Sequence, residues 1–397
     1  MDIKNQIRSL VEELKTLRRD FHQCPELGCE EHRTAEMISK YLAACEIDVR
    51  RITETGIVGL IYGKEKGRTL MLRADMDALP VEEMTSVPYK SKNPGKMHAC
   101  GHDGHMAMLL IAAKILSRNK NRIKGNIKLV FQPNEENMFA DKLVDKGVLD
   151  NPKVDAAFGI HLITSIETGK IGIESGPVMA GMHTFKLTII GQGGHTGIPQ
   201  DSIDPIITAA NIVQAVQIIQ TREIGVLNPT LIVFGKIQGG TMSNVIPDKV
   251  EMEGTIRYLY DIDKHGALNP CDNFERIVRH VCSSHRADYQ IEYPFSQSAV
   301  VNDIKMTQIV KAEAEKVALD GSHIIPYVTM IGEDYGEYAK KVPSAFYFIG
   351  AGNKEKHTDY PHHHPRFDID EDALSTGVEM HVRTALSYLN ATGGDIL

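Results

Sequence analysis

Apolar runs alternate with longer amphipathic segments along the first part of the chain. Three short runs predict buried strands: 69–74 (TLMLRA), 127–131 (IKLVF) and 156–160 (AAFGI). Apolar positions that recur every three or four residues predict helices over 4–21, 31–45, 104–118 and 139–147. Such alternation favours an α/β fold, with a mostly parallel sheet covered by helices on both faces.

The pattern changes near 176–181 (GPVMAG). Strands are predicted at 184–190, 230–237, 248–258 and 289–293, and helices at 204–220 and 272–285. This β-α-β-β-α-β order is that of a ferredoxin-like α+β sandwich. Helix–strand alternation resumes from about residue 300 and ends in a helix near 371–390. We therefore expect residues 181–295 to form a domain inserted into one built from 1–180 and 296–397.

Composition narrows the class of protein. A chain of 397 residues with 42% hydrophobic and 24% charged residues is typical of a globular protein with two domains. The net charge of −8 argues against nucleic-acid and membrane partners. The N-terminal segment lacks the apolar core of a signal peptide, and no apolar run is long enough to span a bilayer.

Six scattered cysteines favour reduced thiols, with a Cys24–Cys29 bridge as the less favoured alternative. We expect a cytoplasmic enzyme.

Potential metal ligands follow the predicted strands. The segment HACGHDGH at 98–105 holds Cys100 and His102, which an extended loop would turn to the same side. Glu135 and Glu136 would point apart in extended backbone, so that one could bind metal while the other reached a metal-bound water. His161 and one histidine of the run 362–364 would complete five ligands for two ions.

Each of these signals also has a simpler interpretation. A single histidine such as His161 is more often a surface or core residue than a ligand, and the two glutamates alone fit a solvated loop. Their joint occurrence at the ends of strands, where chemistry collects in such sheets, favours the metal centre. Paired Cys-x-x-Cys elements, which mark structural zinc sites, do not occur.

Ordered motifs along nearly the whole chain resemble the metallopeptidase family of aminoacylases, carboxypeptidase G and hippurate hydrolases. The similarity is greatest to the branch of hippurate hydrolases, auxin-conjugate hydrolases and N-acetyl-diaminopimelate deacetylases. The motifs include RRDFHQCPELGCEE at 18–31, LRADMDALP at 72–80, MHACGHDGH at 97–105, FQPNEE at 131–136, GQGGHTGIP at 191–199, GEDYGEY at 332–338 and HHHPRFDIDED at 362–372.

The resemblance implies a role for each candidate in a two-metal centre. Glu135 would be the general base, and Asp75 and Asp77 would orient ligands. Zn²⁺ fits thiolate, imidazole and carboxylate best, with Mn²⁺, Co²⁺ or Ni²⁺ as alternatives. The implied metal ligands are Cys100, His102, Glu136, His161 and His363.

The inserted domain resembles the family's lid and dimerisation domain. His195 would stabilise the oxyanion, within its own subunit or across subunits, and Asn244 and Arg257 would bind the substrate's free carboxylate. A homodimer, or a tetramer built from dimers, is implied. The sequence departs from the family pattern at Gln200 and at 137–141 (NMFAD), which leaves the substrate open.

The expected function is metal-dependent hydrolysis of N-acyl-L-amino acids, of N-acetyl or N-benzoyl type, to a carboxylic acid and a free amino acid. Deacylation of N-acetyl-diaminopimelate and cleavage of dipeptides are alternatives within the same chemistry. A non-catalytic binding protein is the alternative from another class, and the presence of all five ligands and the base disfavours it.

Overall fold

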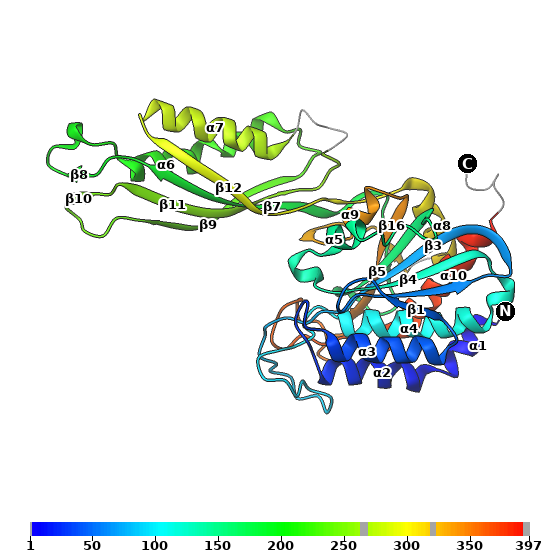
Figure 1. The fold of residues 1–397 in the computed structure, drawn as a ribbon. Helices are drawn as coiled ribbons and strands as arrows, with labels where there is room; N and C mark the ends of the chain where they lie inside the picture. Colours follow the sequence, from blue (N-terminus) through cyan, green and yellow to red (C-terminus); the bar gives the residue numbers. More distant parts are fainter. Residues whose placement is uncertain (1, 263–268, 318–322, 392–397) are drawn as a thin grey trace. The chain divides into compact units, whose positions relative to one another are not determined.

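The computed structural model describes residues 2–262, 269–317 and 323–391 (Figure 1). It divides into two compact units. The first unit comprises Met1–Val178, Val301–Val328 and Asp334–Leu397, and the second comprises Met179–Val300 and Thr329–Glu333. Among the described helices, none combines the length and apolarity needed to cross a bilayer.

The first unit is organised around an eight-stranded sheet in the order β1-β2-β4-β3-β5-β16-β6-β14. The four central strands β4-β3-β5-β16 are mutually parallel, whereas β1, β2 and β6 join by antiparallel pairing. The strands are β1 (Asp48–Arg51), β2 (Ile57–Tyr62), β3 (Glu65–Asp75), β4 (Lys124–Gln132), β5 (Ala156–Glu167), β6 (Ile171–Gly172), β14 (Ile324–Ile325) and β16 (Ser344–Gly352). Every residue of β16 is buried, as expected for a parallel strand covered on both faces.

Helices cover both faces of this sheet. The central helix is α4, which is buried nearly all round and packs against α2, α3 and α10, while the short α5 and α9 contact each other elsewhere on the unit (Figure 1). The helices are α1 (Ile3–Arg8), α2 (Val11–Gln23), α3 (His32–Ala44), α4 (His102–Arg118), α5 (Ala140–Asp145), α8 (Ile304–Val317), α9 (Gly336–Ala339) and α10 (Ala373–Asn390). The single helix predicted over 4–21 is wrong, because the chain breaks at Ser9 and Leu10 between α1 and α2.

The second unit has the predicted ferredoxin-like topology. Its four main strands form an antiparallel sheet in the order β12-β7-β11-β9, and α6 packs against α7 (Figure 1). The elements are β7 (Gly176–Ile190), α6 (Pro205–Ala215), β9 (Thr230–Gly239), β11 (Lys249–Tyr258), α7 (Pro270–Ser284) and β12 (Asp288–Gln297). The helix predicted to reach residue 220 ends at Ala215, and a π-helical turn, Ile219–Glu223, follows it.

The carboxyl ends of the four parallel strands lie at one edge of the first unit's sheet. Asp75 is the last residue of β3, Glu135 and Glu136 follow β4, and His161 lies within β5. The segment that contains His363 follows β16. Adjacent parallel strands therefore bring residues from distant parts of the sequence to the same edge.

Candidate metal centre

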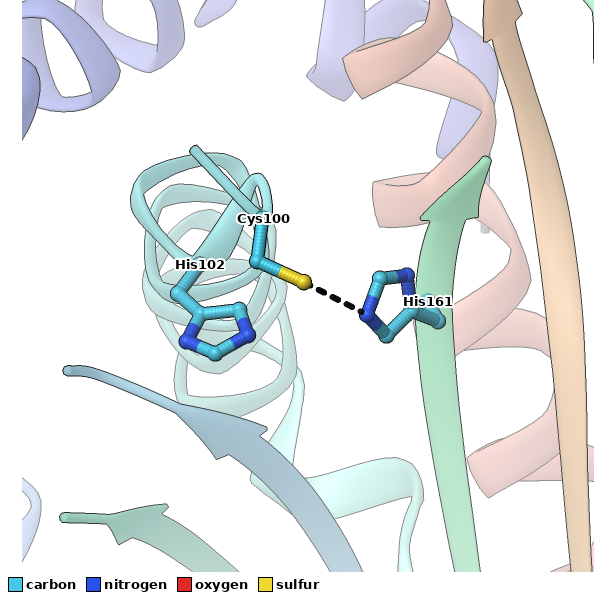
Figure 2. A group of neighbouring side chains, drawn as sticks. All are labelled: Cys100, His102 and His161. Carbon is cyan, nitrogen blue, oxygen red and sulfur yellow. Dashed lines mark hydrogen bonds between the residues drawn. The ribbon is translucent and has the colours of Figure 1, made fainter. Parts of the chain in front are cut away.

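Cys100 lies at the meeting point of two groups of potential ligands. Its Sγ lies 3.6 Å from His161 Nε2, with the ring of His102 beside it (Figure 2). One ligand atom each of Cys100, His102 and His161 lies within 4.8 Å of the others, and the same holds for Cys100, Glu136 and His363. A thiolate shared by two neighbouring groups is suited to bridge two cations.

Backbone carbonyls fix the orientation of two histidines. His102 donates from Nδ1 to the Asp77 carbonyl oxygen at 2.9 Å, and His161 donates from Nδ1 to the Leu162 carbonyl oxygen at 2.7 Å. Each ring then presents the lone pair of Nε2 to the centre. Within the described residues, the buried His102 Nε2 has no hydrogen-bond partner, as expected of a nitrogen that binds a metal ion.

The three histidines at 362–364 differ in their contacts. His363 Nε2 lies 3.3 Å from Glu136 Oε1, a buried oxygen that lacks a hydrogen bond in the described part of the chain. His362 donates from Nε2 to the Leu162 carbonyl oxygen at 2.9 Å, and His364 Nδ1 accepts from the Arg366 amide at 3.0 Å. Of the three, His363 is the one placed with Cys100 and Glu136.

The backbone conformation around the candidate ligands differs from the extended loops that we expected. Gly101 has φ of +87° and precedes α4, so His102 is the first residue of a helix. Glu135 and Glu136 lie in a 3-10 turn, Glu135–Asn137, and His161 lies within β5 instead of after a strand that ends at Ile160. The premise of extended backbone is therefore wrong for His102 and for Glu135 and Glu136, whereas His161 is in a strand.

Three carboxylates hold the turn that contains Glu135 and Glu136. Glu31 Oε1 accepts the amide of Asn134, which has φ of +53°, and Asp77 Oδ2 accepts the amide of Glu136 at 3.1 Å. Asp334 Oδ2 accepts the amides at the start of α5, from residues 139 and 140, at 2.8 and 2.9 Å. The backbone is therefore held at Asn134, at Glu136 and at residues 139 and 140.

Buried charges surround the centre. Asp75 accepts from Arg73 at 2.6 Å and from His105 Nδ1 at 2.6 Å, and His105 Nε2 accepts the Leu162 amide at 2.9 Å. Both ring nitrogens of His105 are thus occupied, which gives this histidine a structural role. Arg73 also donates to Asp334 at 2.9 Å and so links the ends of β3 and the 334–338 segment.

The electrostatic field of the centre favours positive charge. Burial lowers the pKa of His102, but Asp75 and Asp77 outweigh it and raise the pKa to about 10. Burial, Glu136 and Glu135 hold the pKa of the Cys100 thiol well above its usual value. In the metal-free protein the carboxylates therefore retain protons on neighbouring groups, and a divalent cation would displace them.

The three candidates from the inserted region lie in the second unit. His195 in β8 (Gly194–His195) pairs with Val245 in β10 (Val245–Ile246), and it shares a surface pocket with Asn244. Arg257 lies near the other end of β11, paired with Met182, and donates to the Met330 carbonyl oxygen at 2.8 Å. Within one chain, the structure brings His195 and Asn244 together but not Arg257.

Sequence reasoning missed the buried arginines behind the ligands and the networks that they form. Arg73, Gln132 and Asp334 form one buried network, and Arg18, Asp103 and Asp368 form another. The signal that could have revealed Arg73 is a charged residue within an apolar strand, since buried charges require partners. Arg18 lies in the quoted motif RRDFHQCPELGCEE, and nothing in that motif indicates its distant partners.

Thiol, imidazole and carboxylate groups gathered at the carboxyl edge of a parallel sheet, from the buried His102 and His161 to the half-exposed His363, are the arrangement of a metal-dependent hydrolase. Residues 71–387 match the peptidase family M20/M25/M40. Thermostable carboxypeptidase 1 of Saccharolobus solfataricus is 36% identical over 395 residues, 98% of each chain. The N-acetyl-L-cysteine deacetylase of Bacillus subtilis is 37% identical over 370 residues, 93% of this chain and 86% of that protein.

A solved structure extends the similarity to the fold. The Bacillus subtilis YXEP protein, described as a dinuclear metal-binding peptidase of the M20 family, is 30% identical with a TM-score of 0.83. The match covers 97% of this chain and 100% of that chain. The chain therefore belongs to the peptidase family M20/M25/M40 and is a hydrolase.

Proposed function

We propose that this protein is a metal-dependent amidohydrolase that cleaves N-acyl-amino acids to a carboxylic acid and a free amino acid. The observation that carries the proposal is the pair of ligand groups that share Cys100, with the lone pair of His102 Nε2 and an oxygen of Glu136 turned inward. The name of the Bacillus relative, an N-acetyl-L-cysteine deacetylase, supports an acyl-amino-acid substrate.

We assign the two divalent cations to Cys100, His102, Glu136, His161 and His363. Zn²⁺ fits this donor set best, with Mn²⁺, Co²⁺ or Ni²⁺ as alternatives. When bound, the cations would polarise the scissile carbonyl and lower the pKa of the attacking water.

Glu135 is assigned the proton transfers. Its Oε2 lies 3.9 Å from His102 Nε2, beside the ligands. The carboxylate takes a proton from water as the new C–O bond forms, and gives that proton to the amine nitrogen as the C–N bond breaks. Asp77 holds both His102 and the Glu136 amide, so its role is to orient these groups.

We infer that the second unit, the region expected at 181–295, serves as lid and dimerisation domain. His195 would stabilise the oxyanion, and Asn244 and Arg257 would bind the substrate's carboxylate. Arg257 and Asn244 are separated by most of β11, about 27 Å at 3.4 Å per residue. This span exceeds the length of a small substrate, so contact by both residues requires two copies of the chain, which favours a homodimer or a larger assembly. The proposed setting is the cytoplasm.

The function is tested with protein reconstituted with Zn²⁺, Mn²⁺ or Co²⁺ and a panel of hippurate, N-acetyl-methionine, N-acetyl-cysteine, N-acetyl-diaminopimelate and a dipeptide, read by released amine. Glu135→Gln should retain bound metal and lose about 10²–10⁴-fold in kcat. Glu54→Gln, at a side chain that is 84% exposed, is the matched control and should retain full activity. A fully active Glu135→Gln would contradict the assignment of the base, and a panel without turnover would contradict the proposed function.

A further inference from the structure

Arg18 is a fully buried arginine that no step of the proposed chemistry uses. It lies on α2, and its guanidinium is completely enclosed. It donates from Nε to Asp103 at 2.8 Å and from Nη2 to Asp368 at 2.6 Å, and its Nη1 lies 3.4 Å from Glu371. Burying a charge is unfavourable unless it is well paired. A fully buried arginine with three carboxylate neighbours therefore indicates that these contacts have a specific role.

The partners of Arg18 belong to two segments that supply candidate ligands. Asp103 follows His102 directly in the first turn of α4. Asp368 lies five positions after His363, in the segment between β16 and α10. One guanidinium therefore joins the segment of His102 to the segment of His363, which are far apart in the sequence.

Each of the two carboxylates has a second donor. His22 Nδ1 lies 2.7 Å from the same Oδ2 of Asp103, and the Tyr89 hydroxyl donates to Asp368 Oδ2 at 2.9 Å. The Arg18 guanidinium also lies over the ring of Tyr89, 4.8 Å from its centroid. A planar fork with fixed donor directions sets the angle as well as the distance between the segments that it joins.

The segment of His363 is attached on both sides of that residue, by the bond from His362 Nε2 to the Leu162 carbonyl oxygen at 2.9 Å and by the bond from the Met84 amide to the Pro365 carbonyl oxygen at 2.7 Å. The His363 side chain is 51% exposed and its backbone has φ of +65°. Its amide donates to the Ala99 carbonyl oxygen at 2.8 Å, which is the adjacent link to the segment of Cys100 and His102. The bond between Arg18 and Asp368 is thus a buried, charged attachment for a segment whose candidate ligand is half exposed.

We propose that Arg18 is a positioning residue that holds the segments of His102 and His363 together before a cation binds, and thereby sets the affinity for divalent metal. The inference rests on the proposed metal centre. Apparent affinity falls in proportion to the fraction of molecules in the binding-competent arrangement. If Arg18 maintains that arrangement, its loss should weaken metal binding even in a protein that stays folded.

The test is a Co²⁺ titration of metal-free, full-length protein, followed by the absorption of the thiolate–cobalt bond and by competition with a chelator. Arg18→Lys keeps a positive charge but loses the fork, and Asp368→Asn weakens one attachment while the bond to Asp103 remains. Each variant should bind Co²⁺ about 10–100-fold more weakly, the range found when groups behind metal ligands are changed. Combined, their effects should be less than additive, because both act through one contact.

Arg19→Met is the matched control. Arg19 is the next residue on α2, is 45% exposed, and donates to both oxygens of Glu371 at 2.9 and 2.6 Å. Arg19 is partly exposed and pairs with Glu371 instead of with Asp103 or Asp368, so Co²⁺ affinity should stay within about twofold of wild type. Far-UV circular dichroism and Tm identify the variants that remain folded, and Asp368→Asn still decides the matter if Arg18→Lys does not fold.

The outcomes separate the two proposals. Unchanged Co²⁺ affinity in a folded Arg18→Lys or Asp368→Asn protein would overturn the inference about Arg18. The proposed function would still stand in that case, provided that the wild-type protein binds metal and turns over substrate. A lower Tm with unchanged affinity would likewise show that Arg18 stabilises the fold alone. A wild-type protein that binds no Co²⁺ would overturn the proposed metal centre, and this inference with it.

Discussion

His22 offers a test of the buried charge network through the pH dependence of stability. The side chain is buried on α2, with Nδ1 2.7 Å from Asp103 and Nε2 3.4 Å from Glu83. Burial and the charge of Arg18 lower the pKa of His22, but the two carboxylates outweigh them and raise it to about 9. The folded protein therefore binds this proton more tightly than the unfolded chain does.

The sign and size of the effect follow from that difference. An unfolded histidine has a pKa of about 6.5, so the shift is about 2.5 units, and each unit corresponds to about 1.36 kcal/mol. The protonated ring thus contributes about 3 kcal/mol to the free energy of unfolding. Because the folded pKa is raised, this contribution is complete below pH 6.5 and is lost as the pH rises to 9.

The measurement compares wild type with His22→Gln in urea denaturation from pH 6 to pH 9.5, fitted with one transition for each unit. Metal-free protein is used, because metal binding has its own pH dependence. The difference in unfolding free energy of the first unit should shrink by about 3 kcal/mol across this range. His280→Gln, at an exposed position of the second unit, controls for the loss of a histidine. A difference that does not change with pH would refute the reasoning.

Two further predictions concern packing and ion pairs in the first unit. Gly104→Ala places a Cβ 2.5 Å from Leu162 Cδ1 in the core, so we expect a loss of about 1–3 kcal/mol and a lower Tm; an unchanged melting curve would contradict the tight packing. Asp334→Asn removes the charge that faces buried Arg73 and should cost about 3–5 kcal/mol in urea denaturation. Asp372→Asn, at a side chain that is 59% exposed and paired with Lys356, should cost less than about 1 kcal/mol, and equal losses at the two positions would be evidence against this explanation.

The layout of the fold could be predicted from the sequence where burial is complete. The runs at 69–74, 127–131 and 156–160 lie within β3, β4 and β5, because parallel strands covered on both faces need uninterrupted apolar residues. Element ends were less well predicted. The helical period continues across Ser9 and Leu10, and Leu10 is buried like its helical neighbours, so the pattern contains no sign of the break.

The candidate site was predicted by residue type but not by conformation. Cys100, His102, Glu136, His161 and His363 do gather at one edge of the first unit's sheet. The extended backbone assumed for Cys100 and His102 and for the two glutamates is wrong, because a helix starts at His102 and hydrogen bonds from distant residues fix the turn of the glutamates. Glu31 and Asp77, for example, hold the turn of Glu135 and Glu136, and neither contact follows from the local sequence.

Two buried arginines offset part of the negative charge around the centre. Arg73 pairs with Asp75 and Asp334, and Arg18 pairs with Asp103 and Asp368, so that permanent positive charge stands behind the orienting carboxylates. Among the described residues, His102 Nε2, which faces the centre, has no such partner. Since guanidinium neutralises the outer carboxylates at any physiological pH, the inner groups remain for protons or a divalent cation. The ion pairs of Arg18 and Arg73 thereby leave the inner groups available to bind a metal ion.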